Sequence, residues 1–308
     1  MRDGLVWDRA AIARKAHEGF TAPPVPTTDL NERLFQLSGN GRAEWWAAAW
    51  DDFTSNPALG SGAGSYEQHW LRSRPNATEV RDAHGLYVET LAELGPLGLG
   101  LLLAALAIPI VGGIRARNAA LVPVASGAYA AYLTHAGIDW DWEMAGVTAA
   151  ALLCGTALLV AARGATTRPL AGSMRAGALF VVLALTAFSF VGLVGNNALA
   201  AGYDAFASGR SDEAEAQARK AARWAPWSSE PWQLLAEVQL VEGRPALARE
   251  SFRKAIAKGE RNWELWFGLA QASAGEERKR AFARARVLNP LSAELAEYAR
   301  VELAGAGA

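Results

Sequence analysis

The sequence predicts an all-α fold in which four membrane-spanning helices are followed by a short α-solenoid. Two observations lead to this prediction: four long apolar stretches carry no formal charge, and the charged last third of the chain has an internal helical period. These features divide the chain into a loop region at residues 1–93, a membrane region at 94–199 and a repeat region at 200–308.

The composition favours a membrane protein and excludes a nucleic-acid-binding one. Hydrophobic residues make up 51% of the 308 residues, and the formal net charge is −1. No region is basic enough to bind nucleic acid. The single cysteine, Cys154, lies inside an apolar run, so neither a disulfide framework nor a cysteine-based zinc site is available.

The first 93 residues mix loops with short helices. Prolines after position 22 end any helix begun over residues 7–19. In the run RAEWWAAAWDDF, residues 42–53, the side chains of Trp46, Trp50 and Phe53 recur with helical spacing and predict a short helix with an aromatic face. This face either lies on the bilayer surface or packs onto its own domain.

Four stretches are long and apolar enough to cross about 30 Å of hydrocarbon. They are residues 94–114, 118–138, 144–162 and 176–199. Arginines occupy the first and third connections between them, whereas the second connection reads DWDWE and has no cation. The positive-inside rule places the arginine connections in the cytoplasm. The loop region, the acidic tryptophan connection and the repeat region are then expected outside a multi-pass protein of the plasma membrane.

The last third of the chain has an internal period. Trp232 and Trp266 stand 34 residues apart, and each is followed by a Leu-Ala pair three and four residues later. The companion helices carry Ala214, Ala218 and Ala221 in one unit, Ala248, Phe252 and Ala255 in the next, and Phe282 and Ala285 in a third. This pattern resembles the tetratricopeptide repeat (TPR), in which small residues let paired helices approach closely. The resemblance implies a region that binds protein partners.

The segment before the first apolar stretch carries titratable side chains at the membrane edge. Over residues 82–94 the pattern predicts a helix with Asp82 as its N-cap, His84 in its first turn and Tyr87 on the same face. The free amides of such a turn attract an anion and disfavour an imidazolium. A neutral histidine beside a bound anion could take a proton from a hydroxyl. The alternative is a polar loop residue without a catalytic role.

Three arginines in the same segment are candidates for binding phosphate. They are Arg72, Arg74 and Arg81. Guanidinium groups suit bidentate recognition of phosphate, which favours a binding role. The alternative is that they pair with nearby carboxylates on a solvated surface.

Two other features lie near the membrane edge. His135 and Asp139 are four residues apart and predict a polar pair at the outer end of the second stretch, with structural capping as the alternative. The glycine-rich run at residues 60–65 lacks the Gly-Lys-Ser/Thr of a phosphate loop, which favours a flexible turn that folds back on the membrane.

A family resemblance is carried by several residues in a fixed order. They are Gly41-Arg42, Trp46, NPALGSG at 56–62, AHGLY at 83–87 and LAELG at 91–95, where a span begins. Together they resemble the O-antigen ligase and polymerase superfamily over about residues 38–162. In that family a large extracytoplasmic loop carries a histidine followed three residues later by a tyrosine, here His84 and Tyr87.

The resemblance implies a glycosyltransferase that moves glycan from an undecaprenyl-pyrophosphate carrier to a hydroxyl of a glycan or lipid acceptor. His84 would activate the hydroxyl. Arg42, followed by the three arginines above, would hold the pyrophosphate, and Tyr87, His135 and Asp139 would support the site. Neither a metal nor a cofactor is implied, because guanidinium groups can neutralise the developing diphosphate charge.

Two features depart from the family. The residue after the histidine is Gly85, where the family often has asparagine or serine. Family members also carry further spans before the loop, so we expect the chain to correspond to a C-terminal portion that is incomplete alone. The alternative function is a non-catalytic, membrane-anchored TPR protein that scaffolds an assembly of the cell envelope.

Overall fold

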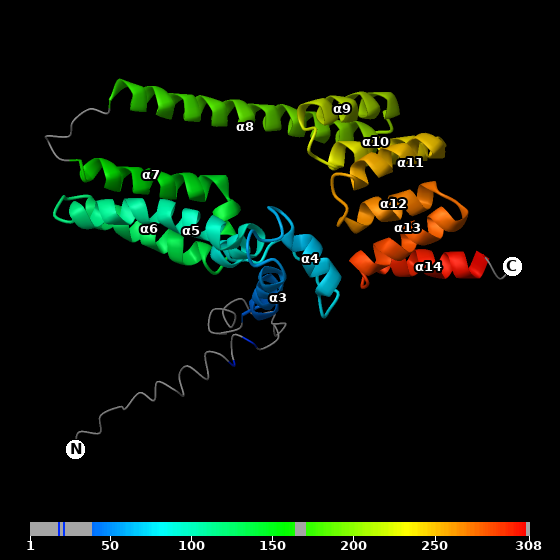
Figure 1. Ribbon diagram of the computed structural model, residues 1–308, viewed down its shortest axis with the longest axis horizontal. Helices are drawn as coiled ribbons and strands as arrows, with labels where there is room; N and C mark the ends of the chain where they lie inside the picture. Colours follow the sequence, from blue (N-terminus) through cyan, green and yellow to red (C-terminus); the bar gives the residue numbers. More distant parts are fainter. Residues whose placement is uncertain (1–17, 19–20, 22–38, 164–170, 306–308) are drawn as a thin grey trace, which may run out of the picture. The chain divides into compact units, whose positions relative to one another are not determined.

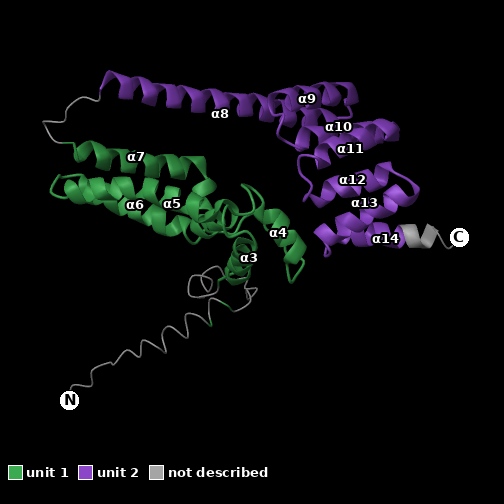
Figure 2. Ribbon diagram, viewed as in Figure 1, with its two compact units in different colours: residues 1–167 green, residues 168–308 purple. Residues whose placement is uncertain are grey.

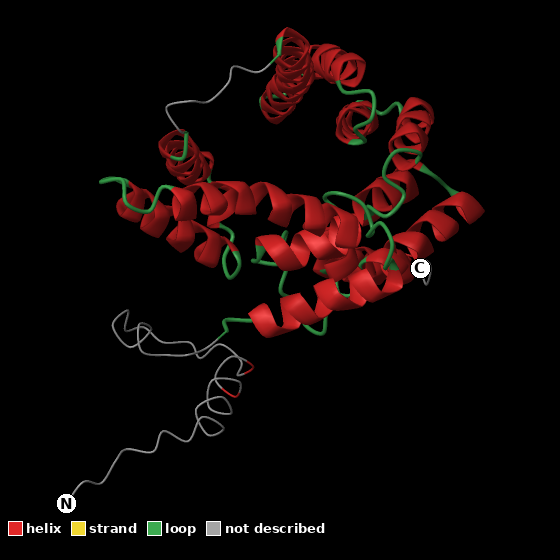
Figure 3. Ribbon diagram, turned by 60° about the vertical axis from the view of Figure 1, so that its left-hand side comes forward, coloured by secondary structure: helices red, strands yellow, loops and turns green. Residues whose placement is uncertain are grey.

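The described part of the chain is helical. A computed structural model gives the structure of residues 18, 21, 39–163 and 171–305. Within these residues the regular elements are α-helices and one short 3₁₀ helix, without strands (Figure 3). The predicted all-α fold class is therefore confirmed. The helix considered at 7–19 lies outside the described residues. The chain divides into two compact units, residues 1–167 and 168–308 (Figure 2).

The first unit packs three apolar helices side by side, with two more polar helices at one end (Figure 1). Its described elements are α3 (Arg42–Ser55), α4 (Tyr66–Ser73), α5 (Leu86–Arg115), α6 (Val122–Ala136), the 3₁₀ helix η1 (Asp141–Glu143) and α7 (Ala145–Ala161). The core between α3, α4 and the start of α5 consists of Ala49, Tyr66, Trp70, Ala83 and Ala92. This core fixes the loop region against the first apolar helix.

Helix α3 confirms the short helix predicted there, but its aromatic side chains do not share one environment. Trp50 is 58% exposed and lies against Phe53, with ring centroids 5.3 Å apart. Trp46 instead turns inward, where its Nε1 donates to the carbonyl of Ala83 (3.0 Å). The buried side of the helix contains Ala49. The helix therefore packs onto its own unit and leaves Trp50 outside.

Helix α5 is broken at Gly95. Gly95 has φ +65°, in the left-handed region that favours glycine, and the proline that follows it has no N–H to donate to Ala92. The carbonyl groups of Ala92 and Glu93 accept instead from the N–H groups of Ser61 (3.0 Å) and Gly62 (2.9 Å). The glycine-rich turn is thus bound to the end of the first segment of α5.

Two helices are long and apolar enough to cross a membrane, α5 and α8 (Gly172–Ala207). They contain the first and fourth predicted stretches. The second and third stretches form α6, of 15 residues, and α7, of 17 residues. Both are shorter than the ~20 residues that a helix needs to cross the hydrocarbon core. Four spans therefore remain a prediction, whereas the two long helices support a membrane protein.

The second unit is a row of helical hairpins (Figure 1). Its elements are α8, α9 (Ser211–Trp224), α10 (Glu230–Val241), α11 (Pro245–Ile256), α12 (Trp263–Ala272), α13 (Gly275–Leu288) and α14 (Ala293–Gly305). Helix α8 packs on α9, α10 on α11 and α12 on α13. The repeating alanines of α9 and α11 are fully buried at these contacts, as at Ala214 and Ala248. The helical character of this region is confirmed, and the repeat period and the TPR assignment remain predictions.

Candidate functional site

The turn at residues 82–85 lies between α3 and the start of α5. Ala83 is fully buried at its centre. Its N–H donates to Glu89 Oε2 (2.8 Å), and its carbonyl accepts from Trp46 Nε1 (3.0 Å). Two side chains thus satisfy the backbone on both sides of Ala83. The turn is fixed, and this positions the next residue, His84.

His84 is paired with Asp82. The Nδ1 atom of His84 lies 2.8 Å from Asp82 Oδ1, and the backbone N–H of His84 donates to the same oxygen (2.9 Å). His84 has φ +52°, in the left-handed region that residues other than glycine rarely adopt. The short Asp82 side chain stabilises this conformation because it satisfies the backbone N–H locally.

The predicted start of the helix was wrong. Helix α5 begins at Leu86 with Gly85 as its N-cap, so Asp82 is not the cap and His84 is not in the first turn. The Asp82 carboxylate binds the N–H of His84 and thereby favours a turn over a helix. The pKa of His84 is consequently raised, chiefly by the hydrogen bond to Asp82, while partial burial and the charge of Arg42 oppose that rise.

Asp82 is the charged partner of the pair. Burial raises the pKa of Asp82, but its hydrogen bonds to His84 outweigh burial and lower the pKa overall. When the proton of neutral His84 is on Nδ1 and faces Asp82, the Nε2 atom is an acceptor. The imidazole ring lies against Trp45, with ring centroids 4.4 Å apart, and 21% of the His84 side chain is exposed. The pair can therefore take a proton from a hydroxyl that reaches Nε2.

Gly85 joins His84 to α5 through a close contact. A Cβ atom at this position would lie 3.0 Å from the carbonyl oxygen of Gly137 and 3.2 Å from Trp46 Nε1. A serine or asparagine here would require one of these groups to shift by a few tenths of an ångström. The contact between the loop and the end of α6 thus favours a small residue at this position.

Arg42 connects α3 to the segment that follows α6. Its Nη2 atom lies 2.8 Å from Asp139 Oδ2, and the two side chains are 20% and 27% exposed. The predicted pair between His135 and Asp139 was wrong, because His135 Nδ1 lies 2.8 Å from Asp141 Oδ2 instead. Helix α6 ends at Ala136, so Asp139 lies beyond its last turn and no longer shares a helix face with His135.

Tyr87 anchors the start of α5 to α6. Its hydroxyl donates to the carbonyl of Leu133 (2.8 Å), and its ring packs against Gly137. We expect Tyr87→Phe to lower the free energy of unfolding in detergent by about 1 kcal/mol, because the carbonyl loses its partner. The NMR titration of His84 should not change. A shifted His84 titration would contradict a purely positioning role for Tyr87.

The other predicted arginines differ in their surroundings. Arg74 is buried, its guanidinium donates to two carbonyl groups of the following turn (3.1 and 3.2 Å), and it pairs with Glu79 (3.2 Å). These contacts hold the turn after α4 together. Arg72 is exposed in the last turn of α4. Arg81 is exposed next to Asp82, and its charge helps to lower the pKa of that carboxyl.

The glycine-rich turn binds a carboxylate of the chain itself. The backbone N–H of Gly64 donates to Glu93 Oε2 (2.8 Å), and that of Tyr66 donates to Glu93 Oε1 (3.0 Å). In a phosphate loop, backbone N–H groups of this kind donate to the bound phosphate. Here they donate to the side chain of Glu93 instead.

The second histidine of the loop, His69, is buried in α4. Its Nδ1 lies 3.3 Å from Asp52 Oδ1, and its Nε2 lies 3.4 Å from Asp51 Oδ2. Only 7% of the side chain is exposed, and both ring nitrogens face carboxylates. His69 therefore supports the packing of α4 on α3, whereas the His84 side chain is 21% exposed and pairs with one carboxylate.

Part of the chain matches a known protein family. Residues 10–103 match the O-antigen ligase family. The matched segment contains Arg42, Asp82, His84 and Tyr87 and ends within α5. No curated protein matches the chain. The family match supports a relationship to the O-antigen ligase superfamily, and together with the two long apolar helices it supports a membrane protein.

The segment that matches the O-antigen ligase family contains neighbours of His84 to which the sequence patterns gave no such role. Asp82 pairs with the ring, Trp45 packs against it, and Glu89 holds the N–H of Ala83. The Asp-x-His spacing is a local signal that could have indicated Asp82, because aspartate often binds the N–H two residues on. Trp45 and Glu89 give no local signal, since their contacts depend on how α3 and α5 pack.

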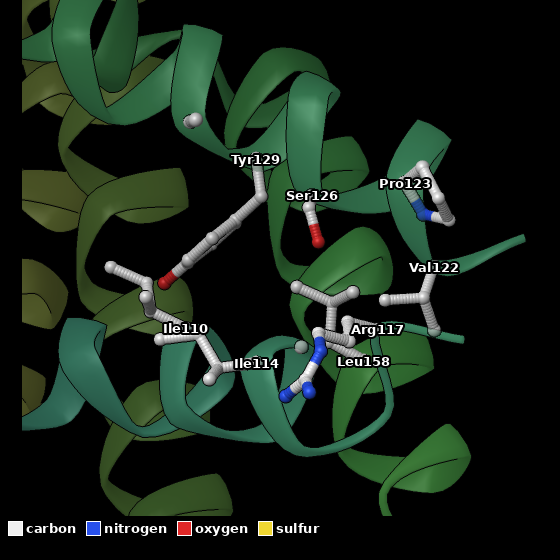
Figure 4. A pocket seen from close by; sticks show the side chains of 10 residues that line it. Ile110, Ile114, Arg117, Val122, Pro123, Ser126, Tyr129 and Leu158 are labelled. Atoms are coloured by element: carbon white, nitrogen blue, oxygen red, sulfur yellow. The ribbon is translucent and has the colours of Figure 1, made fainter. Parts of the chain in front are cut away.

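Two of the cavities in the first unit are lined by residues other than His84 and Asp82. One of about 420 Å³ lies among α5, α6 and α7 and is mainly apolar, with Arg117, Ser126 and Tyr129 as its polar lining (Figure 4). Another, of about 570 Å³, lies between α6 and α7 and contains His135 and Asp141. In the part of the chain that the structure describes, no three His, Cys, Asp or Glu side chains gather closely enough to hold a metal ion.

Proposed function

We propose that the chain carries the histidine-bearing loop of an O-antigen ligase-like glycosyltransferase. The enzyme transfers glycan from an undecaprenyl-pyrophosphate carrier to an acceptor hydroxyl at the outer face of the plasma membrane. The observation that carries this proposal is the Asp82–His84 pair inside the segment that matches the O-antigen ligase family. The arginine connections between the apolar stretches support an external position for this loop.

In this proposal His84 is the general base. Its Nε2 takes the proton of the acceptor hydroxyl while the hydroxyl oxygen forms a bond to the anomeric carbon of the donor glycan. The bond from that carbon to the pyrophosphate oxygen breaks, and undecaprenyl pyrophosphate leaves with the electron pair. Asp82 stabilises the imidazolium, because an opposite charge next to Nδ1 favours the protonated form.

Arginine side chains neutralise the charge of the leaving diphosphate in this proposal. Arg42 is the main candidate, because its charge acts on His84 and Asp139 fixes one edge of its guanidinium. The exposed Arg72 and Arg81 are further candidates. Arg74 is left out because its guanidinium is used to hold the turn after α4. The proposed reaction uses neither a metal nor a cofactor.

Replacing His84 by alanine tests the proposal. In a strain complemented with the complete protein, we expect His84→Ala to abolish glycan transfer, while the amount of protein in the membrane stays unchanged. The matched control is Asp51→Ala, which removes a side chain of α3 that is 69% exposed and has no role in the proposed reaction. The control should retain transfer. Retained transfer in His84→Ala would exclude His84 as the base.

A second candidate function is a non-catalytic, membrane-anchored scaffold of the cell envelope. The row of hairpins in the second unit favours it, because stacked helical repeats commonly bind protein partners. Under this alternative, deletion of the hairpins from residue 208 onward should abolish function, whereas His84→Ala should have little effect.

A further inference from the structure

Helix α8 continues from an apolar stretch into the core of the second unit. It has 36 residues and a length of about 54 Å. Residues 171–190 are exposed, whereas Gly195, Ala198, Leu199 and Ala205 are buried. A hydrocarbon core of about 30 Å takes ~20 helical residues, and the 20 residues after Arg175 end at Gly195. The part of α8 that is needed to cross the hydrocarbon core therefore ends where the hairpin packing begins.

The turn between α9 and α10 lies beside the two turns of α8 that lead to Gly195. Trp227 stacks on Phe188 of α8, with ring centroids 5.6 Å apart and an interplanar angle of 24°. Gly195 permits the close approach, because a Cβ atom there would lie 3.1 Å from Ala225 Cβ. Trp224 and Trp227 are nevertheless 37% and 53% exposed. Two large, partly exposed indole rings thus stand beside the end of the apolar stretch.

The same turn carries positive charge. Arg223 lies in the last turn of α9, and Lys258 donates from its Nζ to the carbonyl of Pro226. Both side chains belong to exposed residues. One acidic residue, Glu230, begins α10. Tryptophan rings favour the membrane–water interface, and lysine and arginine bind the phosphate groups of anionic lipids. The combination matches the head-group region of a bilayer.

We propose that the α9–α10 turn is a membrane-interface anchor. Trp224 and Trp227 enter the head-group region of the leaflet at the C-terminal end of the α8 span, and Arg223 and Lys258 bind lipid phosphate. The anchor holds the hairpins of the second unit close to the bilayer surface. This role is independent of the proposed glycan transfer and requires only that α8 crosses the membrane.

A fluorescent label on the turn tests the anchor in the full-length protein. Cys154 is replaced by alanine, and Ser228→Cys, which retains both tryptophans, receives the label. The protein is inserted into vesicles of phosphatidylethanolamine and phosphatidylglycerol, with or without bromine on the acyl chains near the head group. We expect brominated vesicles to quench most of the emission. Val241→Cys is the matched control, because it is 73% exposed at the other end of α10, about 17 Å along the helix, and should keep its emission.

Three results would overturn the anchor. The first is equal emission from the two labels in brominated vesicles. The second is unchanged quenching at Ser228→Cys when Trp224 and Trp227 are both replaced by alanine. The third is protection of the label from an aqueous quencher without any quenching by bromine, which would mean that a protein and not lipid covers the turn. Weaker quenching in vesicles without phosphatidylglycerol would support the role of Arg223 and Lys258.

Discussion

Replacing Asp82 by asparagine is expected to reduce glycan transfer by about 10²–10⁴-fold while the loop stays folded. Asparagine retains an oxygen that can accept from the backbone N–H of His84, but it lacks the charge that faces Nδ1. The imidazolium formed during transfer then has no counter-charge, and the ring can adopt the other tautomer. Initial rates of transfer, measured in membranes with equal amounts of the two proteins, give the loss.

The pH dependence of transfer checks the same pair independently. A general base must be neutral, so transfer rises as the pH rises through the pKa of His84. Asp82 raises this pKa, so Asp82→Asn lowers it and moves the rise of activity to lower pH. The matched control is Asp51→Asn: Asp51 is 69% exposed beside His69, and its loss should change neither rate nor profile. An unchanged profile in Asp82→Asn would contradict the pairing.

The candidate base could be predicted from the sequence, but its surroundings could not. His84 and Tyr87 belong to a short motif, which a single sequence shows directly. The role of Asp82 was mistaken because two local structures compete for its carboxylate. As an N-cap it would bind an amide of a helix, and in the observed turn it binds the amide of His84. Each arrangement satisfies one backbone N–H, so their free energies differ little and the sequence pattern does not separate them.

Contacts between distant residues were beyond prediction for another reason. Arg42 and Asp139 are 97 residues apart and meet only because α3 packs on α5 and α6 ends before Asp139. A helical period indicated that His135 and Asp139 share a face, which requires the helix to continue past Ala136. Helix α6 ends at Ala136, so Asp139 pairs with Arg42 and His135 pairs with Asp141. Long-range pairing of charges depends on element ends, which sequence patterns define least well.

In the fold, hydropathy predicted the positions of the apolar helices but not the residue at which α8 ends. The apolar stretches indicated the places of α5 to α8, because an apolar run without charges is typical of a long helix that crosses a membrane or packs against other helices. They did not show that α8 runs on through residue 199 to Ala207. The residues after the apolar stretch include several alanines, which have the highest helix propensity. The helix therefore continues beyond the apolar residues.

The second large effect is expected at the glycine-rich turn. Gly60→Ala should lower the free energy of unfolding of the protein in detergent by about 3 kcal/mol or more, from strained backbone and two weakened hydrogen bonds. Gly60 has φ +71°, and a Cβ atom there would overlap the backbone of Glu93. The turn must then move away from α5, and the N–H groups of Ser61 and Gly62 lose the carbonyls of Ala92 and Glu93.

Gly64→Ala is the control for Gly60→Ala, because it introduces the backbone strain without an overlap with Glu93. Gly64 also has φ +71°, but no atom lies within 4 Å of the place that its Cβ would take. Alanine there should cost only about 1 kcal/mol for the left-handed conformation. The larger loss expected for Gly60→Ala follows from the break at Gly95, because Pro96 cannot donate to Ala92 and the turn supplies the missing donor. Equal losses in urea unfolding, followed by tryptophan fluorescence, would show that the turn does not hold the break in α5.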